Sequence, residues 1–403
     1  MKHEIRATPS QWLGMSPARF LRDYWQKHPL LIRAAFPQFS GPVTPDDLAG
    51  LACEDSALAR IAIRDPRSDH WEVRTGPFAA GDFARLPSTH WTLLVQDVDK
   101  WDAQVGALLA AFAFLPRWRF DDVMLSYAVD GGSVGAHIDH YDVFLLQGLG
   151  RKRWQISTDP AAPTAFRDDV ELRLLREFAP THDWTLEPGD VLYLPPGVPH
   201  HGVAVGECLT YSFGLRAPSA AELLLDFSEA FAEHLPESQR MTDPDLAPAR
   251  GDGEIHDTAI ARVMAALPWL RIAPATRAAQ RDEIDPAFLR AWFGRFITRY
   301  RSAQIVAANP QPLTDRAFER AVTQATRVRR NPWSRCAWIR EGNHAVLFVC
   351  GESHVCSPAL ARTLGAYDEF SLADIAPRDR TLVRMLIDAG HFALLRARSR
   401  KSS

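Results

Sequence analysis

The sequence predicts an α+β fold in which a barrel or double-sheet jelly roll is followed by a helical region and a small winged-helix-like module. Three observations lead to this prediction. Short strand-like runs separated by turn signals fill the chain up to about residue 215. From Ala220 apolar residues recur at helical spacing, and from about residue 330 a hairpin pattern precedes two further helices. We therefore expect three domains, which cover residues 1–215, 216–325 and 326–403.

Most of the expected strands lie in the first of these domains. They are short, and turn residues separate them; the clearest turn is Glu187-Pro188-Gly189-Asp190. The strand-like runs are Arg60–Ile63, His90–Val95, Val123–Val129, 137–147, 151–157, Val191–Leu194 and Cys208–Phe213.

The runs 137–147 and 151–157 suggest a β-hairpin, because the Gly-Leu-Gly stretch between them fits a short loop. In the returning strand, alternate residues separate a polar face from a face that carries Lys152, Trp154 and Ile156. A lysine on an otherwise apolar face requires an anionic partner or an exit to water. The carboxylate of a co-substrate would be such a partner.

The second half of the chain is expected to be mainly helical. A hairpin with its turn at residues 341–344 interrupts the helices and suggests the winged-helix module. The expected helices are Ala220–Leu235, 255–272, 286–303, 357–366 and 378–390, and the expected hairpin strands are Cys336–Arg340 and Ala345–Cys350.

Composition indicates a soluble cytoplasmic protein. The chain has 403 residues, of which 46% are hydrophobic and 24% charged, and a formal net charge of −3. This charge argues against nucleic-acid binding by bulk charge alone. The amino terminus lacks the apolar run of a secretory signal, and no stretch reaches the length of a membrane span. The five cysteines form no C-x-x-C pair, so neither a disulfide framework nor a zinc site is indicated.

Two imidazoles and one carboxylate form the most informative feature of the chain. His137 and Asp139 are two residues apart, so on a strand both side chains would point to the same face. His200 follows a Pro-Pro-Gly-Val-Pro stretch far downstream. Two histidines and one carboxylate are the ligand set that holds non-haem Fe(II) in oxygenases, with positions left open for substrate and O₂.

The sequence around these residues resembles that of the JmjC-type 2-oxoglutarate oxygenases. The shared features are Gly-Gly-Ser-Val-Gly-x-His-x-Asp-x-Tyr-Asp-Val-Phe from Gly131, a basic run from Arg151, and Tyr-Leu-Pro-Pro-Gly-x-Pro-His from Tyr193. The match is closest to the bacterial ribosomal oxygenases, and softer similarities at residues 20–33 and 292–297 extend it over most of the chain.

The resemblance implies a double-stranded β-helix of the cupin-like JmjC type. It implies Fe(II) as the metal and 2-oxoglutarate and O₂ as co-substrates, with succinate, CO₂ and a hydroxylated C–H bond as products. The implied substrate is an arginine of large-subunit ribosomal protein sixteen, and the middle helices resemble a homodimerisation region. Related enzymes hydroxylate a ribosomal histidine instead, so histidine remains the alternative target.

The resemblance also implies roles for individual residues. His200 matches the family motif, with His201 as the competing ligand, whereas His140 has the opposite strand parity to His137. Lys152 would form a salt bridge to the distal carboxylate of 2-oxoglutarate. Ser126 and Thr210 are candidates to donate a hydroxyl hydrogen bond to a co-substrate carboxylate; the alternative is that each is an ordinary core hydroxyl. Asp130 is a candidate to bind the guanidinium group of the substrate; the alternative is that it is a plain turn aspartate.

Two other classes of protein remain as alternatives. A cupin-type metalloenzyme without 2-oxoglutarate usually supplies H-x-H and a glutamate, whereas this chain has Asp139 in the second position. A catalytically silent binding module would not need all three ligands. The basic tail, which includes Arg396 and Arg398, is expected to be a solvated end, so we expect no sequence-specific nucleic-acid binding by the winged-helix-like module.

Overall fold

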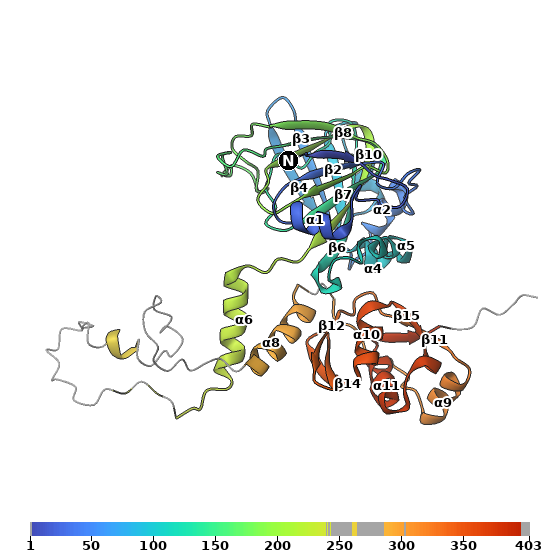
Figure 1. Cartoon of the computed structure of the whole chain (residues 1–403). Coiled ribbons are helices and arrows are strands. Elements are labelled where there is room, and N and C mark those ends of the chain that lie inside the picture. The colour runs from blue at the N-terminus through green and yellow to red at the C-terminus, as the bar shows by residue number, and fades with distance from the viewer. Residues whose placement is uncertain are drawn as a thin grey trace, which may run out of the picture. The chain divides into compact units, whose positions relative to one another are not determined.

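A computed structural model of the chain describes residues 2–238, 240, 242, 260–263, 286–301 and 304–395 (Figure 1). The chain divides into two compact units, one made of Met1–Ala217 with Ile297–Ser403 and the other of Pro218–Phe296. Most of the helix expected over 255–272 and the basic tail lie outside the described residues, although 260–263 are helical.

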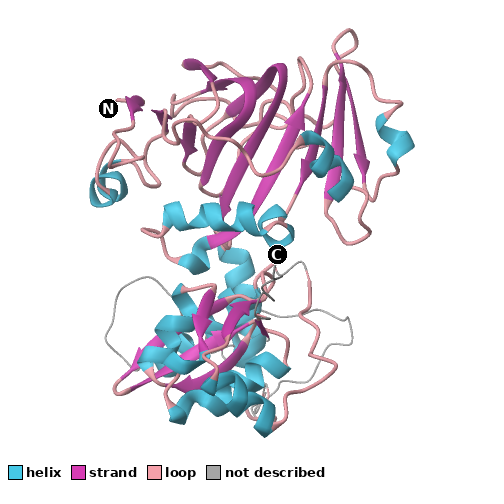
Figure 2. Ribbon diagram, turned by 90° about the vertical axis from the view of Figure 1, so that its right-hand side faces the viewer, coloured by secondary structure: helices cyan, strands magenta, loops and turns pink. Residues whose placement is uncertain are grey.

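A large β-sheet dominates the part of the chain that precedes Ala217. Within the described residues ten strands join it, in the order β1-β2-β9-β7-β10-β6-β5-β3-β4, with β8 also paired to β7. Neighbouring strands are antiparallel except for β1 and β2, and the long strands lie side by side in Figure 2. This architecture confirms the predicted jelly-roll class. The strands are β1 (Glu4–Arg6), β2 (Leu30–Arg33), β3 (Ala59–Asp65), β4 (His70–Thr75), β5 (Trp91–Val95), β6 (Phe120–Ala128), β7 (Val143–Ile156), β8 (His182–Leu186), β9 (Val191–Leu194) and β10 (His200–Leu215).

Short helices complete this part of the chain. They begin where the sequence supplies a capping side chain, as Ser16 does before α1 and Thr44, in a capping box with Asp47, does before α2. The helical segments are α1 (Pro17–Asp23), α2 (Pro45–Leu51), α3 (Ala80–Phe83), α4 (Val98–Trp101), α5 (Ala103–Ala107), η1 (Leu108–Phe112) and η2 (Arg117–Arg119).

Aromatic side chains fill the main core of the sheet. Phe112, Phe144, Phe213 and Tyr193 are all fully buried. The ring centroids of Phe112 and Phe213 lie 4.6 Å apart, and those of Phe144 and Tyr193 lie 4.8 Å apart, which is the range in which aromatic pairs attract. The core therefore fixes β7, β9 and β10, the strands that surround the candidate site.

The expected hairpin around Gly148 and Gly150 is wrong. β7 runs through both glycines as one strand of 14 residues, and its pairing with β10 shifts register beside them. A Cβ on Gly148 would lie 2.5 Å from the Tyr211 ring, and one on Gly150 would lie 1.9 Å from the Glu207 carbonyl oxygen. The glycines are therefore needed for close packing and for a β-bulge, and not for a turn.

The bulge changes which residues of β7 face which side of the sheet. Val143 and Leu145 belong to the same buried cluster as Trp154 and Ile156, although the first pair has odd numbers and the second even numbers. One extra residue between the pairs accounts for this change of parity. The alternation expected beyond the bulge is confirmed, since Lys152, Trp154 and Ile156 are buried while Arg151 and Arg153 are exposed.

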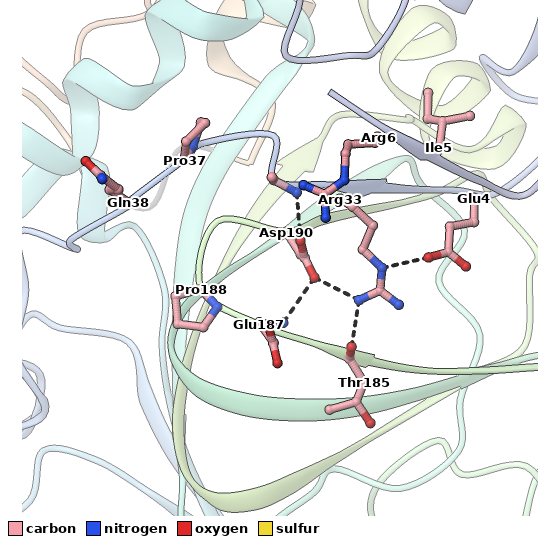
Figure 3. Close-up of a pocket in the computed structure, with 11 residues that line it drawn as sticks. Glu4, Ile5, Arg6, Arg33, Pro37, Gln38, Thr185, Glu187, Pro188 and Asp190 are labelled. Atoms are coloured by element: carbon pink, nitrogen blue, oxygen red, sulfur yellow. Dashed lines mark hydrogen bonds and ion pairs between the residues drawn. The ribbon is translucent and has the colours of Figure 1, made fainter. Parts of the chain in front are cut away.

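A surface cavity of about 790 Å³ lies beside β1, β2 and the turn before β9 (Figure 3). Arg33 donates there to Glu4 Oε1 at 2.7 Å, Asp190 Oδ2 at 2.8 Å and the Thr185 carbonyl at 2.7 Å. Asp190 also accepts from the Ala34 N–H, so the polar groups are engaged in holding the edge strands together. None of the candidate site residues lines this cavity.

Two helices represent the Pro218–Phe296 unit, α6 (Ala220–Ala232) and α8 (Pro286–Arg299), the second of which ends beyond it. Trp292 Nε1 donates to Asp226 Oδ1 at 2.9 Å, and the Trp292 ring lies 5.1 Å from that of Phe227. Among the described helices, none combines the length and the hydropathy of a membrane span.

The C-terminal part of the chain contains the expected hairpin and helices. β12 and β13 pair with the predicted turn between them, and β14 extends this sheet; β11, β15 and β16 form a second small sheet that the sequence did not predict. The elements are α9 (Asp315–Thr323), β11 (Arg327–Arg330), β12 (Cys336–Glu341), β13 (His344–Val349), β14 (Glu352–Cys356), α10 (Pro358–Ala366), β15 (Glu369–Ser371), η4 (Leu372–Asp374), η5 (Pro377–Asp379), α11 (Arg380–Asp388) and β16 (Phe392–Leu394).

Candidate metal centre

The structure brings His137, Asp139 and His200 together. Asp139 Oδ2 lies 3.9 Å from His137 Nε2 and 3.6 Å from His200 Nε2, and one ligand atom from each residue falls within 4.8 Å of the others. His200 is 2% exposed, whereas His137 and Asp139 are partly exposed. The cluster therefore has one buried side and one side that a ligand can reach.

The backbone fixes this geometry. His137 N–H donates to the His200 carbonyl and His200 N–H donates to the His137 carbonyl, both at 3.0 Å, and Gly197 N–H donates to the Asp139 carbonyl at 2.8 Å. The expected start of a strand at His137 is wrong, because β7 begins at Val143. His137 forms an isolated β-bridge with His200, and Asp139 lies in irregular chain. The ligands are thus placed by pairing with the start of β10 and not by strand alternation.

Hydrogen bonds orient both imidazoles. His137 Nδ1 lies 3.0 Å from the Gly135 carbonyl and His200 Nδ1 lies 2.9 Å from the Val198 carbonyl. A carbonyl accepts only, so each Nδ1 carries the proton and each Nε2 presents a lone pair to the cluster. Burial, and then the neighbouring His137, lowers the pKa of His200 to about 4. The neutral imidazole that a metal requires is therefore the stable form.

The other two histidines of the region lie outside the cluster. His201 Nε2 lies 3.0 Å from Ser133 Oγ, and its ring contacts that of Phe178. His140 is exposed, and it lies in irregular chain where strand parity does not apply. Of the two candidates for the third ligand, His200 is the one that the structure places beside Asp139.

Lys152 is a buried lysine, 5% exposed. Within the described part of the chain, no carboxylate pairs with it. Its Nζ lies 5.0 Å from the Trp154 ring, and burial lowers the pKa of the ammonium group. An uncompensated buried ammonium is costly, so this position suits an anionic ligand.

Ser126 and Thr210 face each other across β6 and β10, and both are buried. Thr210 Oγ1 donates to Gln147 Oε1 at 3.1 Å, so its hydroxyl proton is already used in the structure. Next along the same face of β10 is Cys208, which contributes to the electrostatic environment of Lys152. These residues therefore line one side of the sheet together with Lys152.

Asp130 lies in the loop that follows β6 and is exposed. Its Oδ1 accepts from the Gly206 N–H at 2.8 Å, which ties this loop to the bend in β10. One carboxylate oxygen is thus held by the backbone, and Oδ2 is free of any hydrogen bond among the described residues. A fixed carboxylate with a free oxygen can accept from a guanidinium group.

Sequence reasoning assigned no role in the site to three residues that lie in or beside it, Gly202, Trp154 and Tyr141. A Cβ on Gly202 would lie 2.9 Å from Lys152 Cε and 2.8 Å from the Trp154 ring, so this glycine makes room for both side chains. Trp154 Nε1 is buried without a hydrogen-bond partner among the described residues. Burial, and then the Asp139 carboxylate, raises the pKa of Tyr141. A glycine in a strand was the only available signal for Gly202.

Asp142, the second aspartate of the motif, is a structural residue. It is fully buried and accepts from the Tyr193 hydroxyl at 2.6 Å, from Gln26 Nε2 at 2.9 Å and from Arg119 at 3.1 Å. These bonds attach the start of β7 to the N-terminal segment. Asp142 therefore supports the chain that carries Asp139.

The residues present fit a metal and an anionic co-substrate. Two oriented Nε2 atoms and one carboxylate form a facial set with an exposed side. The unpaired Lys152 and the orphan Trp154 Nε1 lie on the strand beside it, and the His200 ring is 5.9 Å from that of Trp154. A jelly-roll sheet with this triad, followed by a winged-helix module, defines a JmjC-type protein.

Comparison with known proteins identifies the family. The JmjC domain family matches residues 107–223, and the ROXA-like winged helix family matches residues 278–392. The chain is 35% identical over 293 residues to the "Ribosomal protein uL16 3-hydroxylase" of Escherichia coli, which covers 73% of this chain and 74% of that protein. The chain belongs to the ribosomal oxygenase family of JmjC proteins.

Further relatives agree with this assignment. A "Probable ribosomal oxygenase" of Haemophilus influenzae is 41% identical over 233 residues, which cover 58% of this chain and 55% of that protein. The crystal structure of Escherichia coli YcfD superposes with a TM-score of 0.78 at 30% identity and covers 94% of this chain and 98% of that chain. A structure of YcfD with cobalt and 2-oxoglutarate superposes with a TM-score of 0.75 at the same identity and coverage.

Proposed function

We propose that this protein is an Fe(II)- and 2-oxoglutarate-dependent hydroxylase of an arginine side chain in the large-subunit ribosomal protein uL16. The observation that carries the proposal is the His137–Asp139–His200 cluster beside the buried, unpaired Lys152. The Escherichia coli relative that is named for uL16 hydroxylation, and the likeness to the YcfD complex with cobalt and 2-oxoglutarate, support the same proposal.

His137, Asp139 and His200 would hold the metal through Nε2 atoms and a carboxylate oxygen. When bound, Fe(II) with 2-oxoglutarate and O₂ supplies the oxidising chemistry that hydroxylates an unactivated C–H bond and yields succinate and CO₂. The contribution of the protein is to orient the ligands and to keep water away, since His200 and Trp154 are buried.

Lys152 would bind the distal carboxylate of 2-oxoglutarate. Its burial makes an ion pair stronger there than at the surface, and Gly202 leaves space beside it. Ser126 would donate its hydroxyl to a carboxylate oxygen. Thr210 would do so after its hydroxyl gives up the hydrogen bond to Gln147 Oε1.

Asp130 would position the substrate arginine. Its Oδ1 is fixed by the Gly206 N–H, so Oδ2 is held in place for a charge-assisted hydrogen bond with the guanidinium group. An extended substrate accords with a chain that devotes nearly half its length to elements beyond the jelly roll. We therefore expect a uL16 peptide to be hydroxylated and free arginine to be left unchanged.

The test is to incubate the protein with Fe(II), 2-oxoglutarate and a uL16 peptide. The succinate formed and the mass of the peptide are then measured. Asp130→Ala should lose peptide hydroxylation but retain slow, uncoupled 2-oxoglutarate turnover. Asp159→Ala is the matched control, because Asp159 is also an exposed turn aspartate whose Oδ1 accepts from a backbone N–H. Hydroxylation of free arginine as efficient as that of the peptide would overturn the substrate assignment.

A histidine target is the second candidate, because the family that the sequence resembles includes enzymes that hydroxylate a ribosomal histidine. "Ribosomal oxygenase 2" of Rattus norvegicus, whose name specifies no target residue, is 45% identical over 76 residues, 18% of this chain. Mass spectrometry of ribosomal proteins from a deletion strain decides between a mass change at arginine and one at histidine. Activity that 2-oxoglutarate stimulates and His137→Ala abolishes would exclude a cupin-type enzyme without 2-oxoglutarate. It would also exclude a silent binding module.

We also propose that the protein is a cytoplasmic homodimer that pairs through its helical region, which residues 216–325 are expected to form. The supporting observation is the exposure of Leu224 at 64% and of Leu225 at 71% on α6. Large apolar side chains that lie next to each other on a surface mark contact sites.

A further inference from the structure

A cavity of about 420 Å³ lies within the unit that contains the jelly roll and the C-terminal elements. Its walls come from α4, α5 and η2 on one side and from β11 and β12 on the other. It contains none of the residues of the candidate metal centre. Its size falls in the range of pockets that hold small molecules, about 300–1,000 Å³.

Two arginines of this cavity share a single carboxylate. Arg216 Nε lies 3.3 Å and Arg335 Nη2 lies 3.1 Å from the same oxygen, Asp121 Oδ1. The side chain of Arg216 is 5% exposed and that of Arg335 is 10% exposed. Burial, and then the neighbouring Arg335, lowers the pKa of Arg216 to about 10. This pair therefore has one positive charge more than its carboxylate balances.

A second pair of arginines repeats the arrangement. Arg117 forms an ion pair with Asp368, and Arg330 Nη2 lies 3.3 Å from the same Asp368 oxygen. The Arg330 side chain is 4% exposed, and its Nε is buried without a hydrogen-bond partner among the described residues. Burial lowers the pKa of Arg330. The second pair thus adds another unbalanced positive charge.

The other charged residues of the lining pair with each other. Arg329 pairs with Glu369 at 2.6 Å, and Lys100 lies 3.1 Å from Asp99. Two further carboxylates that face Lys100, those of Asp97 and Asp122, do not line the cavity. The lining itself therefore has six basic and four acidic residues, and the excess of positive charge lies on guanidinium groups. Guanidinium groups bind phosphate and carboxylate in a planar, bidentate manner.

Apolar residues form much of the remaining lining, which also includes Thr298 and Ser334. The large apolar residues are Leu109, Trp118 and Phe120. An inorganic ion would leave this surface unused, whereas an organic ligand would cover it. A phosphomonoester is close to a dianion at neutral pH and also has an organic part.

We propose that this cavity binds a small phosphomonoester, whose phosphate contacts the two arginine pairs and whose organic group lies against Trp118 and Phe120. The ligand joins the jelly roll to the C-terminal elements, because Arg117 and Arg216 come from the first and Arg330 and Arg335 from the second. The site is independent of the metal centre, so it holds whether or not the proposed hydroxylase activity does.

The experiment is isothermal titration calorimetry of the full chain without added iron. The four ligands are adenosine monophosphate, adenosine, inorganic phosphate and succinate. Adenosine monophosphate should bind at least about tenfold more tightly than adenosine, because only the phosphate reaches the guanidinium groups. Inorganic phosphate should compete with it for one site. Succinate, a dianion with separated charges, should bind more weakly than either.

Arg117→Gln and Arg327→Gln form a matched pair of variants. Both arginines are exposed and each pairs with one carboxylate, Arg117 with Asp368 and Arg327 with Glu369, but only Arg117 lines the cavity. Arg117→Gln should weaken adenosine monophosphate binding about tenfold, because it removes one of the guanidinium groups that contact the phosphate, and Arg327→Gln should leave it unchanged.

Three results would overturn the proposal. Equal affinity for adenosine and adenosine monophosphate would show that the cavity does not recognise the phosphate group. Succinate binding as tight as phosphate would make the site a general dianion site. Equal effects of the Arg117→Gln and Arg327→Gln variants would show that the phosphate binds a diffuse basic surface instead of this cavity.

Discussion

The candidate metal ligands show how much a single side chain is expected to contribute at the residue scale. Asp139 would supply the carboxylate of the triad and is partly exposed, so we expect its loss to leave the core undisturbed. We expect Asp139→Ala to weaken Fe(II) binding roughly 100-fold or more and to abolish turnover, with an unchanged circular dichroism spectrum. Titration with Fe(II) or Co(II) under anaerobic conditions measures the loss.

The control for Asp139→Ala is His140→Ala, which changes an exposed neighbour outside the cluster. That variant should bind the metal as the wild type does. Wild-type activity in Asp139→Ala would show that the triad is assigned incorrectly.

Lys152 is the second test at this scale. Removing a buried charge that pairs with a ligand costs about 1.5–3 kcal/mol, or roughly 10- to 150-fold in binding. Lys152→Ala should therefore raise the KM for 2-oxoglutarate by about this factor while metal affinity stays the same. Lys152→Arg should retain part of the activity, because the positive charge is preserved.

Arg153→Ala is the matched control for Lys152, because Arg153 is the next residue of the same strand but is exposed and paired with Asp183. Its KM for 2-oxoglutarate should not change. If Lys152→Ala leaves this KM unchanged as well, Lys152 has no part in co-substrate binding.

At the scale of single elements, a buried acidic cluster joins α4 to β6. Lys100 faces Asp97, Asp99 and Asp122, and burial raises the pKa of Asp122 to about 7. The folded chain then binds more protons than the unfolded chain between about pH 4 and pH 7. The free energy of unfolding falls as the pH rises through this window because the carboxyl must ionise in a buried site.

Asp122→Asn removes this cost. We expect the variant to equal the wild type near pH 5 and to be roughly 2–4 kcal/mol more stable near pH 8, as measured by urea unfolding. Asp55→Asn, at an exposed position, should show no such pH dependence. A variant that becomes less stable than the wild type near pH 8 would show that the attraction to Lys100 outweighs the burial of Asp122.

β7 shows why a local pattern can mislead at this scale. Gly-Leu-Gly between two strand-like runs has the composition of a hairpin loop. The same glycines allow the Tyr211 ring and the Glu207 carbonyl to approach, and those groups lie some 60 residues downstream on β10. Because these contacts are distant in sequence, no local window distinguishes a turn from a bulge.

At the scale of the whole molecule, the helical region provides the test of assembly. Leu225→Glu places a charge on the exposed apolar face of α6. Burying an unpaired charge is costly, so this variant should shift the proposed dimer to a monomer in light scattering. Val355→Glu is the control, because Val355 on β14 is also 71% exposed. A wild-type chain that is already monomeric would contradict the homodimer proposal.

The sequence by itself determined the jelly-roll and winged-helix classes, because alternating and helical patterns and turn residues are local properties. It also singled out His137, Asp139 and His200, since the residue types and the motif around them are visible along the chain. The division at residues 215 and 325 and the roles of Ser126, Thr210 and Asp130 stay predictions.

Only the tertiary structure decided how these residues are held. His200 was separated from His201 by the pairing of β10 with His137, which also replaced the expected strand over 137–142. Lys152 has no counter-ion among the residues that the structure describes, and Gly202 leaves space for its side chain. Such features depend on contacts between residues far apart in the sequence, whose distances and burial are set by the packing of the whole sheet.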